Sequence, residues 1–438
     1  MTAADKKESR FTAKWKALDK KKKGLVLFFL IFGGTLGILS LIYLPTPFKS
    51  GISGLILADQ TWEGTVHISG DVVAMPWVTI TVKPGTTVTV AANSADVSMS
   101  MPDTSPDDLN TGDPTVDANA GGWDYTRTHI AINILGKLIS KGTPSQPIRF
   151  VSDAPTPTYT DWEGISAKYA EFEYTEIAYS NIGFYSTESF ERVTFNHCYV
   201  HHAWGAGIGF LDPVDRNEMR VIINDTTIQD CGHEAIDTHS SGRMNITNCR
   251  ISESQVGLNL RDDIPGNLGM NVNVRNCIIV NCNWPVLVAG PTVATIRYCT
   301  IEAETQDTSR WHYGSFTMHQ FTNPMAIRFE DGAQDITTIE TTMFFGSPFG
   351  IWNDNGAVSG TVAFNYVNFD NVPAGNEFRT WIQTKGTYTT YASGFVNAPG
   401  GDFTLAVGSA CLMAGPSGTQ IGAYGGGIAP GASIGWHP

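Results

Sequence analysis

Apolar and polar residues alternate along most of this chain, and the alternation recurs in units of 22 to 28 residues between positions 172 and 301. Alternation with a period of two predicts strands, and a repeat of this length predicts stacked coils. One branched apolar residue recurs in each unit, with spacings of 23, 28, 23, 28 and 22: Ile177, Val200, Ile228, Ile251, Ile279 and Ile301. Stacking these residues would build a continuous core. The pattern therefore predicts an all-β fold, a parallel β-helix solenoid.

A small residue that can lie in the interior precedes each branched residue by two positions: Thr175, Cys198, Thr226, Cys249, Cys277 and Cys299. Neighbouring strands lie ~4.8 Å apart, so Cys249, Cys277 and Cys299, which fall on successive coils, would have their thiols close together. We interpret them as buried free thiols that pack like small hydrophobic groups, with a disulfide as the alternative. No CxxC pair occurs, which argues against a zinc or redox site.

The N-terminal region has a different pattern. Residues 24–44 are uncharged and mostly apolar, which is enough to cross a bilayer once as an α-helix. Residues 1–23 hold nine basic and three acidic residues, so the positive-inside rule places them in the cytoplasm. This predicts a single-pass membrane protein with a C-terminal ectodomain at the cell surface or in the periplasm. A cleaved signal peptide, cut after Leu55-Ile56-Leu57-Ala58, is the alternative.

The remaining chain is strongly acidic. Residues 24–438 contain 19 basic and 39 acidic residues. Nucleic acid needs a basic face, so this balance argues against a nucleic-acid partner.

The domain organisation follows from these patterns. We expect a basic tail at 1–23, the span at 24–44, a linker at 45–60, the β-helix at 61–430 and a tail at 431–438. Two stretches interrupt the strands, a polar insertion at 94–125 and a loop insertion at 303–323. Within the first, Asp108, Asn110 and Asp113 place oxygen ligands at alternate positions, as calcium loops do. The spacing is not that of an EF-hand, so a solvated loop without calcium is the alternative.

Three stretches resemble a known group of proteins: residues 78–90 (VTITVKPGTTVTV), 142–153 (GTPSQPIRFVSD) and 161–165 (DWEGI). They are similar to the opening coils of right-handed parallel β-helix surface proteins of the pectin-lyase-like superfamily. Residues 402–425 resemble the closing segment of that group. The resemblance implies a right-handed β-helix over roughly 60–430. It leaves function open, because the superfamily includes lyases, hydrolases, binding proteins and inert scaffolds.

One group of polar residues is a candidate site. It lies in the later strand and turn of neighbouring coils, and its central members are His233, Asp237, His239, Arg261 and Asp262. Aligning the coils places Gly209, Asp237 and Leu260 in one row, with His239 near Asp262. Histidine beside carboxylate supports proton transfer or metal ligation. A structural role in the turns is the alternative. The same group includes His201, His202, Glu234 and Asp263.

The first strand of each repeat offers a second outward face. Its exposed positions are Thr194/Asn196, Ile222/Asn224, Asn245/Thr247, Asn273/Arg275 and Thr295/Arg297. Calcium-dependent lyases of the family use several aspartates near an arginine, and no aspartate accompanies Arg275 and Arg297 in these rows. Asn224 and Asn245 each begin a glycosylation sequon, and Asn245 should face outward together with Thr247. Aromatic rings stack on sugars, so Trp204, Trp284, Trp311, Tyr313 and Trp352 are further candidates.

Three functions fit these observations. The favoured one is a non-catalytic surface scaffold that presents a binding or assembly face to glycans or proteins. The alternatives are a polysaccharide lyase or glycoside hydrolase, and an accessory subunit that docks through its helix on a larger membrane complex. No cofactor is certain, although calcium fits the loop described above.

Overall fold

A computed structural model of the 438-residue chain describes residues 51–92, 129–186, 191–211, 220–239, 242–262, 269–307, 309, 312–313, 316–317, 323–330, 337–353, 361–373, 377–379, 383–385, 388–429 and 432–438. The chain forms two compact units, 1–49 and 50–438, and all described residues belong to the second. Within the described residues, no helix is long and apolar enough to span a membrane. The predicted span 24–44 and the calcium candidates Asp108, Asn110 and Asp113 lie outside this part of the chain.

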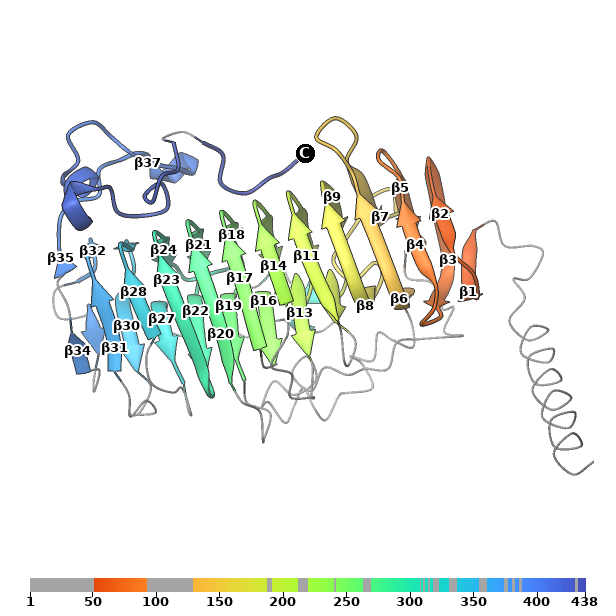
Figure 1. Cartoon of the computed structure of the whole chain (residues 1–438), viewed down its shortest axis with the longest axis horizontal. Coiled ribbons are helices and arrows are strands. Elements are labelled where there is room, and N and C mark those ends of the chain that lie inside the picture. Colours follow the sequence, from red (N-terminus) through yellow and green to blue (C-terminus); the bar gives the residue numbers. More distant parts are fainter. Residues whose placement is uncertain are drawn as a thin grey trace, which may run out of the picture. The chain divides into compact units, whose positions relative to one another are not determined.

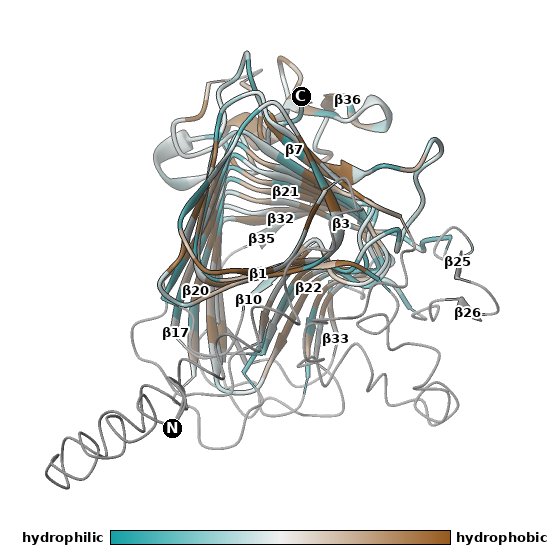
Figure 2. Ribbon diagram, turned by 90° about the vertical axis from the view of Figure 1, so that its right-hand side faces the viewer, coloured by the Kyte–Doolittle hydropathy of each residue, from teal (hydrophilic) through white to brown (hydrophobic). Residues whose placement is uncertain are grey.

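The second unit is a parallel β-helix in which three sheets enclose an apolar interior (Figures 1 and 2). The first sheet contains the late residues of β6 (Ala131–Lys141) and β8 (Gly164–Glu173), together with β2 (Gln60–Trp62), β4 (Thr79–Val82), β11 (Arg192–Asn196), β14 (Arg220–Asn224), β17 (Gly242–Thr247), β20 (Met270–Arg275), β23 (Thr292–Arg297), β28 (Thr337–Glu340), β31 (Thr361–Asn365) and β34 (Gln383–Lys385).

The second sheet follows the first along the chain in every coil. It contains the early residues of β3 (Thr65–Ala74), with β5 (Thr87–Val90), β7 (Ile148–Ser152), β9 (Thr175–Ala178), β12 (Tyr199–Ala203), β15 (Thr227–Cys231), β18 (Arg250–Ser252), β21 (Ile278–Cys282), β24 (Thr300–Ala303), β29 (Met343–Phe345), β32 (Val367–Asp370) and β35 (Tyr388–Thr389).

The third sheet completes each coil. It contains β1 (Ile52–Ile56), the late residues of β3, the early residues of β6 and β8, β10 (Phe184–Ser186), β13 (Ile208–Leu211), β16 (Glu234–His239), β19 (Val256–Arg261), β22 (Trp284–Ala289), β27 (Met325–Phe329), β30 (Phe349–Asn353) and β33 (Phe378–Arg379). Two short antiparallel pairs lie outside the coils, β25 (His312–Tyr313) with β26 (Phe316–Thr317) and β36 (Phe395–Asn397) with β37 (Asp402–Leu405).

The predicted register of the branched residues is confirmed. Val200 pairs with Ile177 and Ile228, and Ile251 pairs with Ile228 and Ile279. Their side chains are at most 1 % exposed. The repeat therefore places equivalent side chains directly above one another in the core.

A left-handed residue bends the chain between the first and second sheets. The φ angles of this row are all positive, from 44° to 56°: Tyr174, His197, Asp225, Asn248, Asn276, Tyr298, Thr341 and Tyr366. A non-glycine residue adopts this conformation at a cost, so it needs support from its surroundings. Backbone hydrogen bonds between coils supply part of it, as in the bond from the Asn248 N–H to the Arg275 carbonyl (3.0 Å).

The predicted column of small residues is also confirmed, since Thr175, Cys198, Thr226, Cys249, Cys277 and Cys299 are fully buried. All seven cysteines are free thiols. The Cys277 thiol donates to the carbonyl of Arg275 (3.3 Å), and the Thr226 hydroxyl donates to the carbonyl of Asn224 (2.9 Å). A thiol and a hydroxyl therefore form the same hydrogen bond at this position, each donating to the carbonyl two residues earlier.

Substitutions at Cys277 test this column. We expect Cys277→Thr to change the free energy of unfolding by less than about 1 kcal/mol, because the hydroxyl can form the bond that Thr226 forms. Cys277→Leu should lower the free energy of unfolding by about 1–3 kcal/mol, because it adds bulk to a filled column. Urea unfolding measures both. A wild-type melting temperature that falls strongly on addition of a reducing agent would contradict the free-thiol assignment.

The C-terminal segment packs on the second sheet and runs back along the solenoid (Figure 1). Outward side chains Ile278 and Val280 form a buried cluster with Phe403, Tyr424 and Ile434 of this segment, among others. Hydrogen bonds join the same surfaces, for example from Asn276 Nδ2 to the carbonyls of Ala423 (2.9 Å) and Gly425 (2.7 Å). The segment includes three short 3-10 turns, η3 (Ala398–Gly400), η4 (Ala410–Met413) and η5 (Pro416–Gly418). It therefore covers the part of the second sheet between β12 and β29.

Two predicted boundaries differ from the structure. β1 (Ile52–Ile56) begins inside the segment that was predicted as a linker, because it already pairs with β3. The predicted tail contains a bridge between Trp436 and Thr226 and so belongs to the cover of the second sheet.

Candidate functional site

The predicted polar group lies on the third sheet, with a register one residue away from the expected one. Asp237 pairs with Gly209 and with Asn259 rather than Leu260, and His239 pairs with Arg261. The turn between the second and third strands is one residue shorter in the later coil. The offset therefore changes from 23 residues at Ile228 and Ile251 to 22 residues at Asp237 and Asn259.

The structure brings Asp237, His239 and Arg261 together. His239 Nε2 lies 3.4 Å from Asp237 Oδ1, and Asn259 Nδ2 donates to the same oxygen at 2.8 Å. Burial acts to raise the pKa of Asp237, but the positive charges of His239, His233 and Arg261 act against it, and the net shift is downward. Asp237 is 3 % exposed and His239 is 6 % exposed, so the two side chains lie in a closed network.

The network continues along the third sheet towards the C-terminal coils. Arg261 Nη2 lies 2.6 Å from Glu330 Oε2, and Arg328 Nη2 lies 2.9 Å from Glu330 Oε1. The Arg328 guanidinium stacks 3.8 Å above the centre of the Trp284 ring. These contacts link three neighbouring coils, and the charged side chains pair with one another.

The two other candidates are placed differently. Asp262 is fully buried just after β19, and His233 forms an ion pair with Glu234 at the start of β16. The five predicted residues therefore do not converge in an open groove. Trp204 and Trp284, proposed as sugar platforms, are 2 % and 8 % exposed and have little accessible ring surface.

His201 and His202, which the sequence pattern assigned to the same group, form another cluster on the second sheet. His201 Nε2 lies 3.2 Å from Glu176 Oε1, and Arg149 Nε donates to Glu176 Oε2 at 2.7 Å. His202 Nε2 lies 3.3 Å from Asp230 Oδ2. Burial acts to raise the pKa of Glu176, yet hydrogen bonds from His201 and Arg149 lower it to about 2. Glu176 is 4 % exposed and Arg149 is half exposed beside it, so the carboxylate of this cluster is closed off by its partners.

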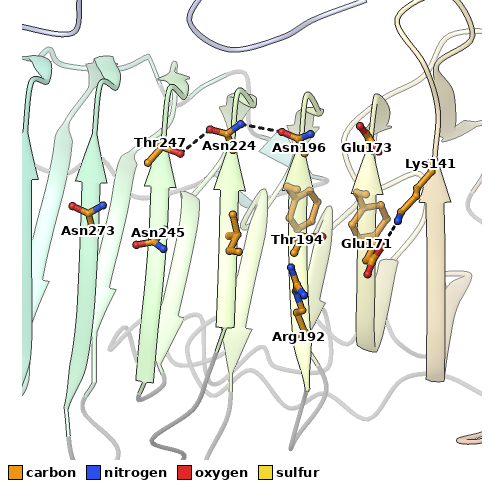
Figure 3. A pocket seen from close by; sticks show the side chains of 13 residues that line it. Lys141, Glu171, Glu173, Arg192, Thr194, Asn196, Asn224, Asn245, Thr247 and Asn273 are labelled. Atoms are coloured by element: carbon orange, nitrogen blue, oxygen red, sulfur yellow. Dashed lines mark hydrogen bonds and ion pairs between the residues drawn. The ribbon is translucent and has the colours of Figure 1, made fainter. Parts of the chain in front are cut away.

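An open groove lies instead on the first sheet (Figure 3). Its volume is ≈ 520 Å³, and it crosses six neighbouring strands, from the end of β6 to β20. Ten of its thirteen lining residues are polar or charged; the lining comes from Lys141, Glu171, Phe172, Glu173, Arg192, Thr194, Phe195, Asn196, Ile222, Asn224, Asn245, Thr247 and Asn273. The predicted outward rows Thr194–Ile222–Asn245–Asn273 and Asn196–Asn224–Thr247 are confirmed by the strand register.

Amides and hydroxyls form a polar ladder across the groove. Asn224 Nδ2 donates to Asn196 Oδ1 at 3.0 Å, and Thr247 Oγ1 donates to Asn224 Oδ1 at 2.7 Å (Figure 3). Asn245 and Asn273 are paired neighbours in the adjacent row. Asn245 is exposed and Asn273 half-buried. The groove therefore offers neutral donors and acceptors on successive coils, spaced by ~4.8 Å.

Charged groups mark the N-terminal end of the groove. Glu171 forms an ion pair with Lys141 and accepts a hydrogen bond from the Tyr169 hydroxyl. The hydrogen bond from Lys141, followed by that from Tyr169, lowers the pKa of Glu171. A glycosidase acid needs a carboxyl that stays protonated at the working pH. Glu171 is ionised and engaged, which suits ligand binding better than acid catalysis.

Sequence reasoning missed Glu171 and Glu173 because β8 serves two sheets in one ten-residue strand. Its early residues pair within the third sheet and its late residues within the first. The alternation of Ala170 and Phe172 with Tyr169, Glu171 and Glu173 was the available signal.

The sequons and the metal prediction have separate outcomes. Asn224 is engaged in the ladder, whereas Asn245 is exposed as expected. Within the part of the chain that the structure describes, no group of three or more His, Cys, Asp or Glu side chains is arranged to hold a metal ion. The predicted calcium ligands lie outside that part, so calcium binding stays a prediction.

Comparisons with known proteins agree with the fold. A family described as "Right handed beta helix region" matches residues 212–323. The crystal structure of pectate lyase Pel9A is similar, with a TM-score of 0.45 and 12% sequence identity over 80% of this chain and 88% of that chain. No curated protein matches the chain. The family match and the pairing of the strands support an all-β, right-handed parallel β-helix.

Proposed function

We propose that this chain is a non-catalytic binding protein whose first-sheet groove holds an extended glycan across several coils. The observation that carries the proposal is the open groove with its repeated amide and hydroxyl side chains. A sugar chain presents hydroxyl groups at regular intervals, and a row of Asn and Thr side chains on successive coils can donate to and accept from them. The buried networks around Asp237 and Glu176 offer no comparable access.

The proposal includes the cellular setting predicted from the sequence. Residues 24–44 anchor the chain once in a membrane, and the acidic solenoid lies outside the cytoplasm. A binding surface in this position would meet polysaccharides of the cell exterior. An ionised Glu171 does not suit the acid role of a glycosidase.

Alanine substitutions in the groove test the binding function. Asn245→Ala and Asn273→Ala should each weaken binding of a polysaccharide ligand by roughly 3- to 10-fold, the loss that follows from one missing hydrogen bond. Asn365→Ala is the matched control, because Asn365 ends β31 on the same sheet, outside the groove. The measurement is a panel of plant, bacterial and algal polysaccharides, screened by glycan array and quantified by calorimetry.

The same panel distinguishes a binding protein from an enzyme. We expect neither new reducing ends nor unsaturated products with any polysaccharide. Cleavage that disappears in Asp237→Asn or Glu171→Gln would overturn the proposal and favour a lyase or hydrolase. Binding that is unaffected by both groove substitutions would place the ligand elsewhere.

A further inference from the structure

The first two coils share a corner with exposed apolar side chains, between the third sheet and the first. The chain turns there at residues 57–59 and again at 75–78. Trp77 is 67 % exposed and Leu57 is 53 % exposed. Ala58 and Pro76 are exposed beside them.

Hydrogen bonds hold this corner in place. Trp77 Nε1 donates to the Leu57 carbonyl at 3.1 Å, and the Met75 N–H donates to the Ile56 carbonyl at 3.1 Å. The Asp59 carboxylate accepts the Thr79 N–H at 2.8 Å. The polar atom of the indole is therefore bonded within the protein, while most of the side chain remains accessible. Such a ring has an apolar surface to offer and needs no polar partner for its N–H.

The position of the corner along the chain limits what it can meet. Seven residues, 45–51, separate the predicted span 24–44 from Ile52 at the start of β1. Even fully extended, seven residues reach about 25 Å at most. When the span is inserted, the first coil must therefore stand close to the bilayer surface.

We propose that the corner formed by Leu57, Ala58, Pro76 and Trp77 rests in the headgroup region of the membrane and orients the solenoid on it. Tryptophan is enriched at this depth of the membrane. The inference rests on the membrane anchor of the proposed function. The proposed partner of this corner is a lipid surface, and a contact with a second copy of the chain is the alternative that the test distinguishes.

A spin label on the full-length chain in phosphatidylcholine vesicles tests the contact. The native cysteines are all buried, so the substitution Ala58→Cys provides one reactive thiol and keeps Leu57 and Trp77. We expect the label to be accessible to oxygen and shielded from a water-soluble nickel complex. Replacing both Leu57 and Trp77 by serine should remove that shielding. Val407→Cys is the control, because Val407 is fully exposed (103 %) in the C-terminal segment and should stay accessible to nickel.

Carbonate extraction tests the membrane anchor separately from the lipid contact of the corner. If the protein stays in the membrane but the Ala58→Cys label is as accessible to nickel as the control, the anchor stands and the lipid contact is wrong. If carbonate releases the chain, both are overturned. Spin–spin broadening between labels in vesicles, with no change in oxygen accessibility, would assign the corner to a second copy instead.

Discussion

Replacing Phe195 by alanine is expected to lower the free energy of unfolding by about 3–5 kcal/mol, the usual cost of emptying a buried aromatic site. Phe195 is fully buried, and its ring stacks on Phe172 with centroids 4.7 Å apart. Phe184 meets both rings at 5.5 Å, nearly edge-on. The three rings come from successive or facing strands, so no single neighbour can move to fill the space.

Urea unfolding of the purified protein measures this effect. The slope of the transition should stay constant, because the substitution changes stability rather than the surface exposed on unfolding. Val407→Ala is the control and should change the free energy by less than about 0.5 kcal/mol, since Val407 is fully exposed. A loss below about 1 kcal/mol for Phe195→Ala would mean that this part of the interior is loosely packed.

Replacing Glu176 by glutamine is expected to lower the free energy of unfolding at pH 7 by about 3 kcal/mol. The pKa of Glu176 is lowered from 4.5 to about 2 in the folded state. A pKa difference of this size corresponds to roughly 3 kcal/mol of extra stability from the ionised form. The substitution removes this charge from between Arg149 and His201 and leaves both without their carboxylate.

The loss of stability in Glu176→Gln should depend on pH in a defined direction. A carboxyl with a lowered folded-state pKa stabilises the fold above its unfolded pKa of 4.5, and this stability is lost as the pH falls towards about 2. The difference between wild type and Glu176→Gln should therefore be full at pH 6–7 and shrink steadily below pH 4.5. Glu63→Gln is the control, because Glu63 is exposed. A difference that stays constant from pH 7 to pH 3 would show that packing, not charge, explains the loss.

The two stability predictions concern polar and apolar parts of the same coils. The aromatic stack lies inside, while the Glu176 network lies outside the second sheet. The groove lies on the outer surface of the first sheet and stays open. Lys141 and Glu171 pair with each other at one end of the groove, and the neutral rows beyond them remain available to a ligand.

Much of the fold could be predicted from the sequence, because a solenoid repeats the same environment in every coil. The branched residues from Ile177 to Ile301 and the column from Thr175 to Cys299 fill the interior at fixed positions. Only one register stacks them, and the structure has that register. The outward rows of the first sheet, including Asn196 and Asn224, follow from the same alternation.

The candidate site could be predicted only in part. Asp237, His239 and Arg261 were correctly grouped, but a turn shorter by one residue placed Asn259 rather than Leu260 beside Asp237. A shift of one residue reverses which side chains face outward, so a small change of turn length has a large effect. Burial of the group was not visible in the local pattern.

The strands, the coil period, the core columns and the outward rows follow from the amino-acid pattern, since they depend on contacts between equivalent positions of neighbouring coils. Which outward face stays open depends instead on the tertiary fold. The C-terminal segment covers part of the second sheet through contacts such as Arg250 with Gly401, which lie 151 residues apart. Long-range contacts of this kind depend on the geometry of the whole solenoid, and no periodic pattern in the chain encodes them.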